Sequence, residues 1–337
     1  MKGGSQTRLS YGLNLMTKTE GRPIGRPSVF AWLQDAAEPD IQPRMWEHPP
    51  APGAADTREP LSDFKRLIPA ITAALYDHAS ATPLFDAAAA DLAATSAVLL
   101  LLGRCKPAEG RASEACLVLN KRSAAVRQSG DLCCPGGGVA PRFDFGVARM
   151  LGLPLGPLGR WPFWRRWRRQ KPLEGRWLAL YYATALREAF EEMRLNPLRV
   201  RFLGPLPQQR LVLFRRLIYP LAAWVPHQQR FKPNREVERI LRIPLRRLLS
   251  PEHYVRYQLT MAVPAGSPGP ETVRDVPGFR WRAPHGTELL WGATYRITMS
   301  FLKIAFGFAP PEIAHLPRVT GYLNESYLSG EREMETP

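Results

Sequence analysis

Apolar residues begin to recur at helical spacing from residue 64 onward. The residues that follow this spacing are Phe64, Leu67, Ile68, Ile71 and Leu75. Ser62 and Asp63 stand just before them and are suitable N-cap residues. The pattern therefore predicts a helix from about residue 63, with Pro69 as a point where it kinks or restarts.

Short apolar runs after this helix predict buried strands. Residues 96–102 (SAVLLLL) and 115–119 (ACLVL) form two such runs, and the segment 104–113 between them contains proline and glycine. This segment predicts a hairpin-like connection. Two further runs, over residues 211–214 and 218–225, predict two more strands.

Three later segments show helical patterns. Residues 183–195 (ATALREAFEEMRL) consist largely of strong helix formers with one apolar face. In residues 240–249, Pro244 stands at a position that suits the start of a helix. Residues 288–306 predict a final amphipathic helix.

Residues 1–60 differ from the rest of the chain. They are rich in proline and small polar residues and show no sustained periodicity, which is typical of a flexible arm. We expect one domain over residues 61–310, with an insertion at about 147–180, and a C-terminal tail over residues 311–337.

The composition supports a globular protein with anionic partners. Hydrophobic residues make up 45% of the chain, which excludes wholesale disorder. The 46 basic and 30 acidic residues leave a net charge of +16. This charge favours nucleic acid, phosphorylated metabolites or an acidic membrane surface, without selecting among them.

The N-terminus lacks the apolar run of a signal peptide, and no apolar run reaches the roughly 18–20 residues that a membrane-spanning helix needs. We expect a soluble, cytoplasmic protein. The four cysteines lack the paired spacing of a zinc site, so we expect buried free thiols.

A cluster of carboxylates in the predicted helix 183–195 is the first candidate for chemistry. Glu188 and Glu192 are four residues apart and share a face, and Glu191 lies one turn from Glu188. A bound cation would relieve their mutual repulsion, and carboxylate oxygens are ligands that Mg²⁺ prefers. Arg187 can hold one carboxylate through a bidentate contact. The alternative is a solvated charged helix face, which is common.

A run of glycines is the second candidate. Gly136, Gly137 and Gly138 follow Pro135, and such a run lets backbone amides approach anionic oxygens. An ordinary turn is the alternative for this run on its own. Together with the carboxylate helix, it indicates a site for a metal ion and a diphosphate.

These motifs resemble the Nudix box, which reads glycine, five residues, an acidic residue, seven residues, then Arg-Glu-apolar-x-Glu-Glu-x-Gly-apolar. Gly138 and Asp144 match the first part, and residues 185–195 (ALREAFEEMRL) match the second. The resemblance covers about residues 62–308. It implies an α/β fold, the Nudix α/β/α sandwich with a mixed β-sheet, in which the box forms a loop, a helix and a loop.

The sequence is most similar to the coenzyme A pyrophosphatase branch of that family. The similarity lies in residues 121–123 (KRS), 130–137 (GDLCCPGG), 236–237 (EV), 243–245 (IPL) and 291–294 (WGAT). It implies hydrolysis of the diphosphate bond of coenzyme A or acyl-coenzyme A.

Two features depart from the family pattern. About 35 extra residues separate Asp144 from Arg187, and Arg194 stands where the box has glycine. That glycine adopts a left-handed conformation at the end of the helix, which costs energy for arginine. The three box glutamates are retained, so we expect an active site.

The resemblance also implies roles for individual residues. A water molecule attacks a phosphorus atom of the diphosphate, assisted by Mg²⁺ or Mn²⁺. The metal ligands are Glu188, Glu191 and Glu192, which form the catalytic set with Arg187. The substrate-binding residues are Arg122, Arg127, Gly136, Gly137 and Gly138, with surface charge as the alternative for the two arginines. Glu236 is a positional candidate for a general base.

The insertion mixes aromatic and basic residues over residues 160–176. This mixture suits an anionic membrane surface, where aromatic rings enter the headgroup region. It also suits single-stranded nucleic acid, through stacking and cation–π contacts. In the third interpretation, the tryptophans pack on the protein's own core while the arginines face water.

Three function classes follow. The favoured one is a diphosphate hydrolase acting on coenzyme A or a related nucleotide derivative. The second is a Nudix-fold binding or regulatory module without turnover. The third is a basic peripheral protein whose main partner is lipid or nucleic acid.

Overall fold

The structure is a computed structural model, and it describes residues 61–84, 92–105, 113–211, 216–228, 230–261, 272–283, 285–323 and 327. The predicted arm, residues 1–60, lies outside the described residues. No helix in the described part of the chain is long and apolar enough to cross a membrane.

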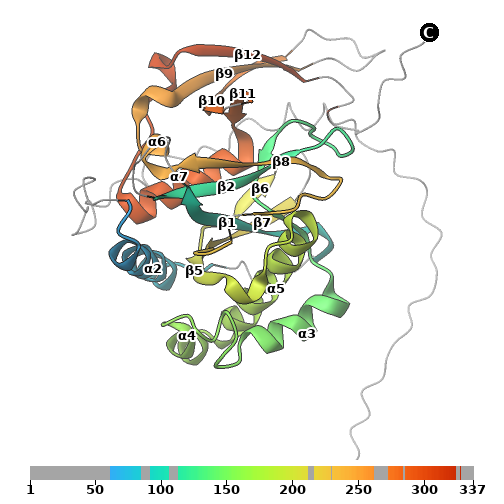
Figure 1. Cartoon of the computed structure of the whole chain (residues 1–337), viewed down its shortest axis with the longest axis vertical. Helices are drawn as coiled ribbons and strands as arrows, with labels where there is room; N and C mark the ends of the chain where they lie inside the picture. Colours follow the sequence, from blue (N-terminus) through green and yellow to red (C-terminus); the bar gives the residue numbers. More distant parts are fainter. Residues whose placement is uncertain are drawn as a thin grey trace, which may run out of the picture. The chain divides into compact units, whose positions relative to one another are not determined.

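A mixed β-sheet forms the centre of the fold (Figure 1). Its strands are β1 (Thr95–Cys105), β2 (Glu114–Arg122), β3 (Leu132–Cys133), β4 (Gly136–Gly138), β5 (Arg201–Pro205), β6 (Gln209–Leu211), β7 (Arg216–Trp224) and β8 (Val237–Pro244). Along the order β3-β2-β1-β7-β5, β1 and β7 are parallel and the other pairs are antiparallel. In addition, β4 pairs with β1, β6 with β7 and β8 with β2.

Helices cover both faces of this sheet. They are α2 (Phe64–Ala81), α3 (Pro141–Leu151), α4 (Trp164–Gln170), α5 (Pro172–Met193), α6 (Leu245–Leu248) and α7 (Gly292–Phe306). Leu99 and Leu101 of β1 pack in a core with α3, α4 and α5, whereas Leu100 and Leu102 pack in a second core with α2 and α7. The continuous burial of β1 on both faces explains its uninterrupted apolar sequence. The predicted α/β class with a mixed sheet is confirmed.

A second, four-stranded sheet was not predicted from the sequence. Its order is β11-β10-β9-β12, formed by β9 (Tyr254–Met261), β10 (Thr272–Ala283), β11 (Gly286–Leu290) and β12 (Arg318–Leu323). The strand β12 lies within the segment predicted as a C-terminal tail. The prediction of one helix over residues 288–306 is wrong at its start, because residues 286–290 pair with β10 and α7 begins at Gly292.

The first predicted helix is confirmed. Asp63 is the N-cap of α2, and its side chain accepts hydrogen bonds from the amides of Lys65 and Arg66. Pro69 lies inside the helix without ending it. The helix predicted near Pro244 is short, because residues 240–244 belong to β8 and only α6 follows.

The helix that carries the carboxylates is longer than predicted. It begins at Pro172 instead of residue 183, and most of its added turns are buried among the core residues. It ends at Met193, and its C-cap residue Arg194 has φ 55° and ψ 38° in the left-handed region. The side chain of Arg194 lies over the ring of Phe190, and the Gln228 amide donates a hydrogen bond to its carbonyl oxygen. These contacts offset part of the cost of placing arginine there.

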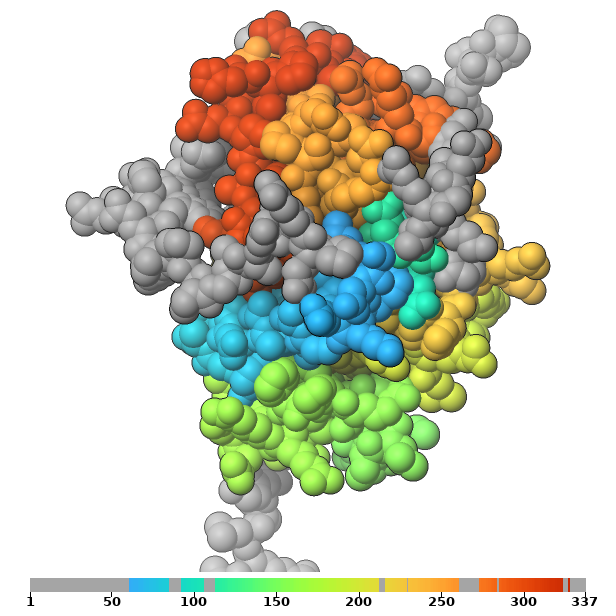
Figure 2. Space-filling view, turned by 60° about the vertical axis from the view of Figure 1, so that its left-hand side comes forward, coloured from blue at the N-terminus to red at the C-terminus, as the bar shows by residue number. Residues whose placement is uncertain are grey.

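The tryptophans of the insertion are core residues. Trp161, Trp164 and Trp167 are at most 5% exposed, and Tyr76 of α2 stacks on Phe163 with ring centroids 3.9 Å apart. Figure 2 shows α2, in blue, above the light green insertion. The arginines at 165, 166, 168 and 169 are exposed. The tryptophans therefore belong to the hydrophobic core while the arginines face water, as the third interpretation of this segment expected.

The four cysteines are free, as expected, but only Cys116 and Cys134 are buried. Cys105 and Cys133 are partly exposed, so the expectation of buried thiols is wrong for these two. The glycine run forms β4 rather than a turn, with an unusual backbone angle only at Gly136, where φ is 148°.

Candidate active site

The helix α5 places Glu188 and Glu192 against the glycine strand β4. The backbone amide of Gly136 donates a hydrogen bond of 3.2 Å to Glu192 Oε2. A Cβ atom built on Gly137 would lie 2.6 Å from Glu188 Cδ. The carboxylate of Glu188 therefore occupies the space that a side chain at position 137 would need. Two carboxylates one helical turn apart thus meet two consecutive glycines.

Glu192 is the more buried of the two carboxylates and has a perturbed pKa. Its Oε2 also accepts a hydrogen bond of 2.9 Å from Asn120 Nδ2 of β2. Burial raises the pKa of Glu192 to about 8, the Gly136 amide opposes this rise, and the charge of Glu188 adds to it. Burial also raises the pKa of Glu188, while Arg187 lowers it.

Arg187 and Asp144 fix the position of this helix relative to β4. Asp144 is fully buried, and its Oδ1 accepts a hydrogen bond of 2.8 Å from Arg187 Nε. Its Oδ2 accepts from Thr184 Oγ1 at 2.8 Å and from the Ala140 amide at 2.7 Å. Arg187 Nη2 also donates to the carbonyl oxygen of Gly138 at 3.0 Å. Asp144 and Arg187 are therefore held together, although they are far apart in the sequence.

Glu191 is oriented differently from the other two glutamates. Its side chain is 53% exposed, and its Oε1 lies 3.4 Å from Arg187 Nη1. Arg187 Nη1 also lies 3.0 Å from Glu188 Oε1. The structure therefore brings Glu188 and Glu192 together at β4 and directs Glu191 toward Arg187.

The donor set suits a divalent cation at the Glu188–Glu192 pair. Within the described ranges, no group of three or more His, Cys, Asp and Glu residues is arranged to hold a metal ion. The pair nevertheless concentrates carboxylate charge in a partly buried place, and burial with the Glu188 charge raises the pKa of Glu192. Asn120 Oδ1 beside it is buried without a hydrogen-bond partner among the described residues. Carboxylate and amide oxygens are the hard donors that Mg²⁺ prefers.

The predicted substrate-binding arginines occupy different surroundings. The charge of Arg122 lowers the pKa of Glu192, so Arg122 lies near the carboxylates, and its Nε donates to the Arg127 carbonyl oxygen at 2.8 Å. The side chain of Arg127 is exposed. The charge of Glu236 raises the pKa of Glu192, which places Glu236 near the carboxylate pair as well.

Two residues of the site were missed in the sequence. Asn120 ends the buried run of β2 and is 1% exposed, so a polar residue closing an apolar strand was the available signal. Thr184 lies one turn before Glu188 in α5 and gave no comparable signal, because its partner Asp144 is far away in the sequence.

Comparisons with known proteins give a limited result. No family model matches the chain, and no curated protein is detectably similar in sequence. Among solved structures, the Nudix hydrolase RenU from M. smegmatis matches at 14% identity over 46% of this chain and 73% of that chain, with a TM-score of 0.29.

A NUDIX hydrolase from Alicyclobacillus acidocaldarius matches at 16% identity, over 46% of this chain and 80% of that one, with a TM-score of 0.30. The NUDIX domain of Shewanella oneidensis NrtR, solved with ADP ribose, matches at 14% identity, over 51% and 85%, with a TM-score of 0.28.

The glycine strand provides a test of the packing. In Gly136→Ala, the new Cβ would lie 2.3 Å from the Ala97 carbonyl oxygen at a φ of 148°. We expect the free energy of unfolding to fall by at least about 2 kcal/mol from overlap and backbone strain. Gly138→Ala is the control, because nothing lies within 4 Å of its Cβ. Urea denaturation measures both, and an equal loss in both variants would contradict the described packing.

The raised pKa of Glu192 predicts a pH effect on stability in metal-free protein. In the folded chain the pKa is about 8, whereas an unfolded glutamate titrates near about 4.3. Between these values the folded state keeps a proton that the unfolded state has lost, so the free energy of unfolding falls as pH rises through this window. Glu192→Gln removes this contribution. The measurement is urea denaturation from pH 5 to 9 in the presence of a chelator. The free energy of unfolding of wild type should fall relative to that of the variant as pH rises. Parallel pH dependences of the two proteins would contradict the raised pKa of Glu192.

Proposed function

We propose that the protein is a Nudix-type hydrolase that cleaves the diphosphate bond of a nucleotide derivative with the help of Mg²⁺. The observation that carries this proposal is the meeting of Glu188 and Glu192 with the glycine strand β4, locked by Asp144 and Arg187. The glutamates, the glycines and the arginine are the residues that the Nudix box would supply.

Glu188 and Glu192 are the proposed principal metal ligands. A bound Mg²⁺ would supply charge neutralisation at the phosphoryl oxygens and lower the pKa of a water molecule. Glu191 is retained as the third proposed ligand because it lies one turn from Glu188, and its contact with Arg187 makes it a separate variant in the test. Mn²⁺ is a suitable substitute for Mg²⁺.

Other residues of the chain orient the site and bind the substrate. Arg187 holds α5 to β4 through Asp144 and Gly138, and so fixes the direction of the carboxylates. Arg122 supplies positive charge beside Glu192 and is the proposed contact for a substrate phosphate. Glu236, whose charge raises the pKa of Glu192, is the proposed general base. Arg127 and the three glycines are proposed substrate contacts from the sequence resemblance alone.

The insertion is compatible with this function. Asp144 precedes it and Arg187 follows it, yet their side chains lie 2.8 Å apart. The added residues form α4 and the first turns of α5, which pack on the core away from β4.

Coenzyme A or acyl-coenzyme A is the proposed substrate. This choice is supported by the sequence resemblance at residues 121–123 and 130–137. In the structure, the first of these segments ends β2 at Arg122, and the second leads through β3 into β4. Both segments therefore adjoin the carboxylates.

The direct test is metal-dependent turnover. We expect purified protein with Mg²⁺ to cleave coenzyme A into 4′-phosphopantetheine and adenosine 3′,5′-bisphosphate, detected by mass spectrometry. Acyl-coenzyme A, ADP-ribose, NADH, dinucleoside polyphosphates and nucleoside triphosphates complete the panel. Glu188→Gln and Glu192→Gln should each lower kcat/KM by at least about 100-fold, because each removes a charged ligand at the reacting phosphate.

Two further variants sharpen this test. Glu191→Gln should have a smaller effect if Glu188 and Glu192 are the principal ligands. Glu312→Gln changes a carboxylate that is 86% exposed in another part of the chain, and it should retain wild-type turnover. Cleavage of a different panel member would support the hydrolase activity and contradict coenzyme A as the substrate. Absence of metal-dependent turnover throughout the panel would favour a binding module.

A further inference from the structure

The outward side of α3 carries large apolar side chains in contact with water. Phe143 and Phe145 are exposed, and Met150 is 67% exposed. Phe143 and Met150 are seven residues apart, so they lie along one side of the helix. The opposite side is buried, and there Asp144 binds Arg187 of α5. The exposed apolar side chains therefore stand on a helix that the core holds in place.

The turn after α3 adds two leucines to this surface. Leu153 is exposed, and Leu155 is 90% exposed. The amide of Gly156 donates to the Leu153 carbonyl oxygen at 2.8 Å, and the amide of Gly159 donates to the Leu151 carbonyl oxygen at 3.0 Å. A Cβ atom on Gly159 would lie 1.7 Å from the Leu153 carbonyl oxygen. The turn is therefore tightly wound, and it holds Leu155 out in water.

Arginines lie beside these apolar side chains. Arg142 and Arg149 of α3 are exposed and are the sequence neighbours of Phe143 and Met150. Neither arginine forms an ion pair with another described residue. The acidic residue of the segment 141–171 is Asp144, which is fully buried. The exposed part of this segment is therefore positively charged without a compensating carboxylate of its own.

The helix α4 extends the positive charge. Trp164 Nε1 donates a hydrogen bond of 3.1 Å to the Gly152 carbonyl oxygen, which joins the start of α4 to the end of α3. Figure 1 shows both helices on the side of α5 that faces away from the central sheet. The exposed arginines of α4 are Arg165, Arg166, Arg168 and Arg169. We call the surface formed by α3, the turn 152–160 and α4 the α3–α4 face.

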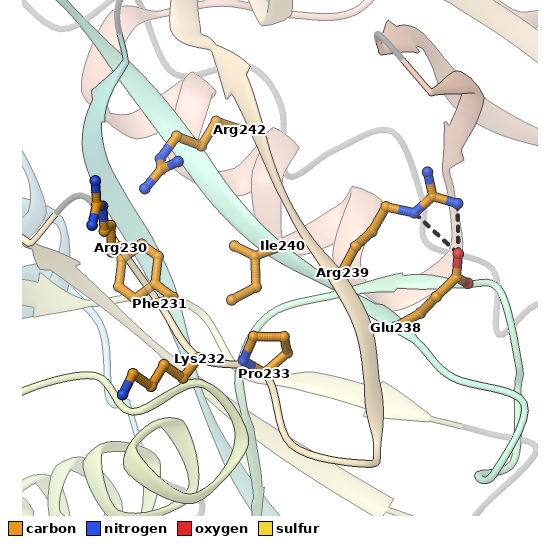
Figure 3. A pocket seen from close by; sticks show the side chains of 8 residues that line it. All are labelled: Arg230, Phe231, Lys232, Pro233, Glu238, Arg239, Ile240 and Arg242. Carbon is orange, nitrogen blue, oxygen red and sulfur yellow. Dashed lines mark hydrogen bonds and ion pairs between the residues drawn. The ribbon is translucent and has the colours of Figure 1, made fainter.

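Basic side chains also line a pocket of about 480 Å³ between β8 and the segment that follows β7 (Figure 3). This basic pocket contains Arg230, Lys232 and Arg242. Its apolar members, Phe231 and Ile240, are partly buried and pack against the core. They are therefore not free to enter another phase, unlike the apolar side chains of the α3–α4 face.

We propose that the α3–α4 face docks on a lipid bilayer with anionic headgroups. Phe143, Met150 and the two leucines of the turn enter the headgroup region, where their apolar surface leaves water. The arginines bind lipid phosphates and carboxylates at the same depth. This interaction goes beyond the proposed function and does not depend on it.

The chemistry of the face favours a bilayer over other anionic partners. Single-stranded nucleic acid binds through the stacking of bases on aromatic rings, and the aliphatic side chains of Met150, Leu153 and Leu155 cannot stack in this way. A second copy of the chain would bring two positively charged faces together, and their repulsion opposes such a contact. A bilayer offers an apolar interior and anionic groups together.

The test measures the partition of the full-length protein between water and vesicles. The vesicles contain either phosphatidylcholine alone or phosphatidylcholine with phosphatidylserine, and bound protein is separated by flotation. We expect the partition coefficient to be at least about tenfold higher for the vesicles with phosphatidylserine, because several arginines meet the anionic surface. This difference should shrink as the salt concentration is raised.

A first pair of variants tests the apolar contribution at constant charge. Met150→Gln/Leu155→Gln should lower the partition coefficient for phosphatidylserine vesicles at least about tenfold, because two side chains can no longer enter the headgroup region. The matched control is Val273→Gln/Tyr322→Gln, which changes two exposed apolar residues of the second sheet. The control should bind vesicles as wild type does.

A second pair tests the charge. Arg142→Gln/Arg149→Gln should also lower the partition coefficient at least about tenfold. Arg282→Gln/Arg318→Gln removes two exposed arginines from the second sheet and lowers the net charge equally, so it should retain wild-type binding. Thermal denaturation establishes which variants are folded, and the exposed positions of all eight residues favour folding. If one pair contains an unfolded variant, the other pair decides.

Equal partition of wild type into both kinds of vesicle, or no partition into either, would overturn the proposal. So would equal losses in a variant and its control, because the effect would then not belong to the α3–α4 face. Binding of wild type to a single-stranded oligonucleotide without binding to vesicles would also overturn it, in favour of nucleic acid. None of these measurements requires turnover, so the hydrolase proposal stands or fails separately.

Discussion

The buried ion pair between Asp144 and Arg187 is the contact on which the candidate site depends. Asp144 is fully buried, and its carboxylate accepts hydrogen bonds from Arg187, Thr184 and the Ala140 amide. Arg187 also binds the Gly138 carbonyl oxygen. These bonds join α3, α5 and β4 at one point. Breaking such a pair by removing one partner costs about 3–5 kcal/mol, because the remaining charge stays buried without compensation.

This contact explains how residues that are far apart in the sequence form a compact site. The residues between Asp144 and Arg187 leave the site through α3 and return through α5, and their tryptophans extend the core beneath the sheet. Since the pair fixes the rotation of α5, Glu188 and Glu192 face the glycines and Glu191 lies toward Arg187. The end of the same helix binds residues 232–234, so the basic pocket is positioned by the same helix.

Features that depend on local sequence were predictable. The apolar run of β1, the N-cap at Asp63 and the shared face of Glu188 and Glu192 follow from composition and spacing. Features that depend on distant pairing were not. Residues 288–290 continue the helical pattern of α7, and only pairing with β10 places them in a strand. Asn120 belongs to the site because β2 and α5 meet, and the basic pocket exists because β8 pairs with β2.

The central claim is that Glu188 and Glu192 together hold a divalent cation. Its most direct test is a titration of Mn²⁺ followed by electron paramagnetic resonance, which separates free from bound metal, with Mg²⁺ as competitor. The account predicts saturable Mn²⁺ binding that Mg²⁺ displaces and that disappears in the folded Glu188→Gln/Glu192→Gln variant. Binding of equal affinity in that variant, or no saturable binding in wild type, would contradict it.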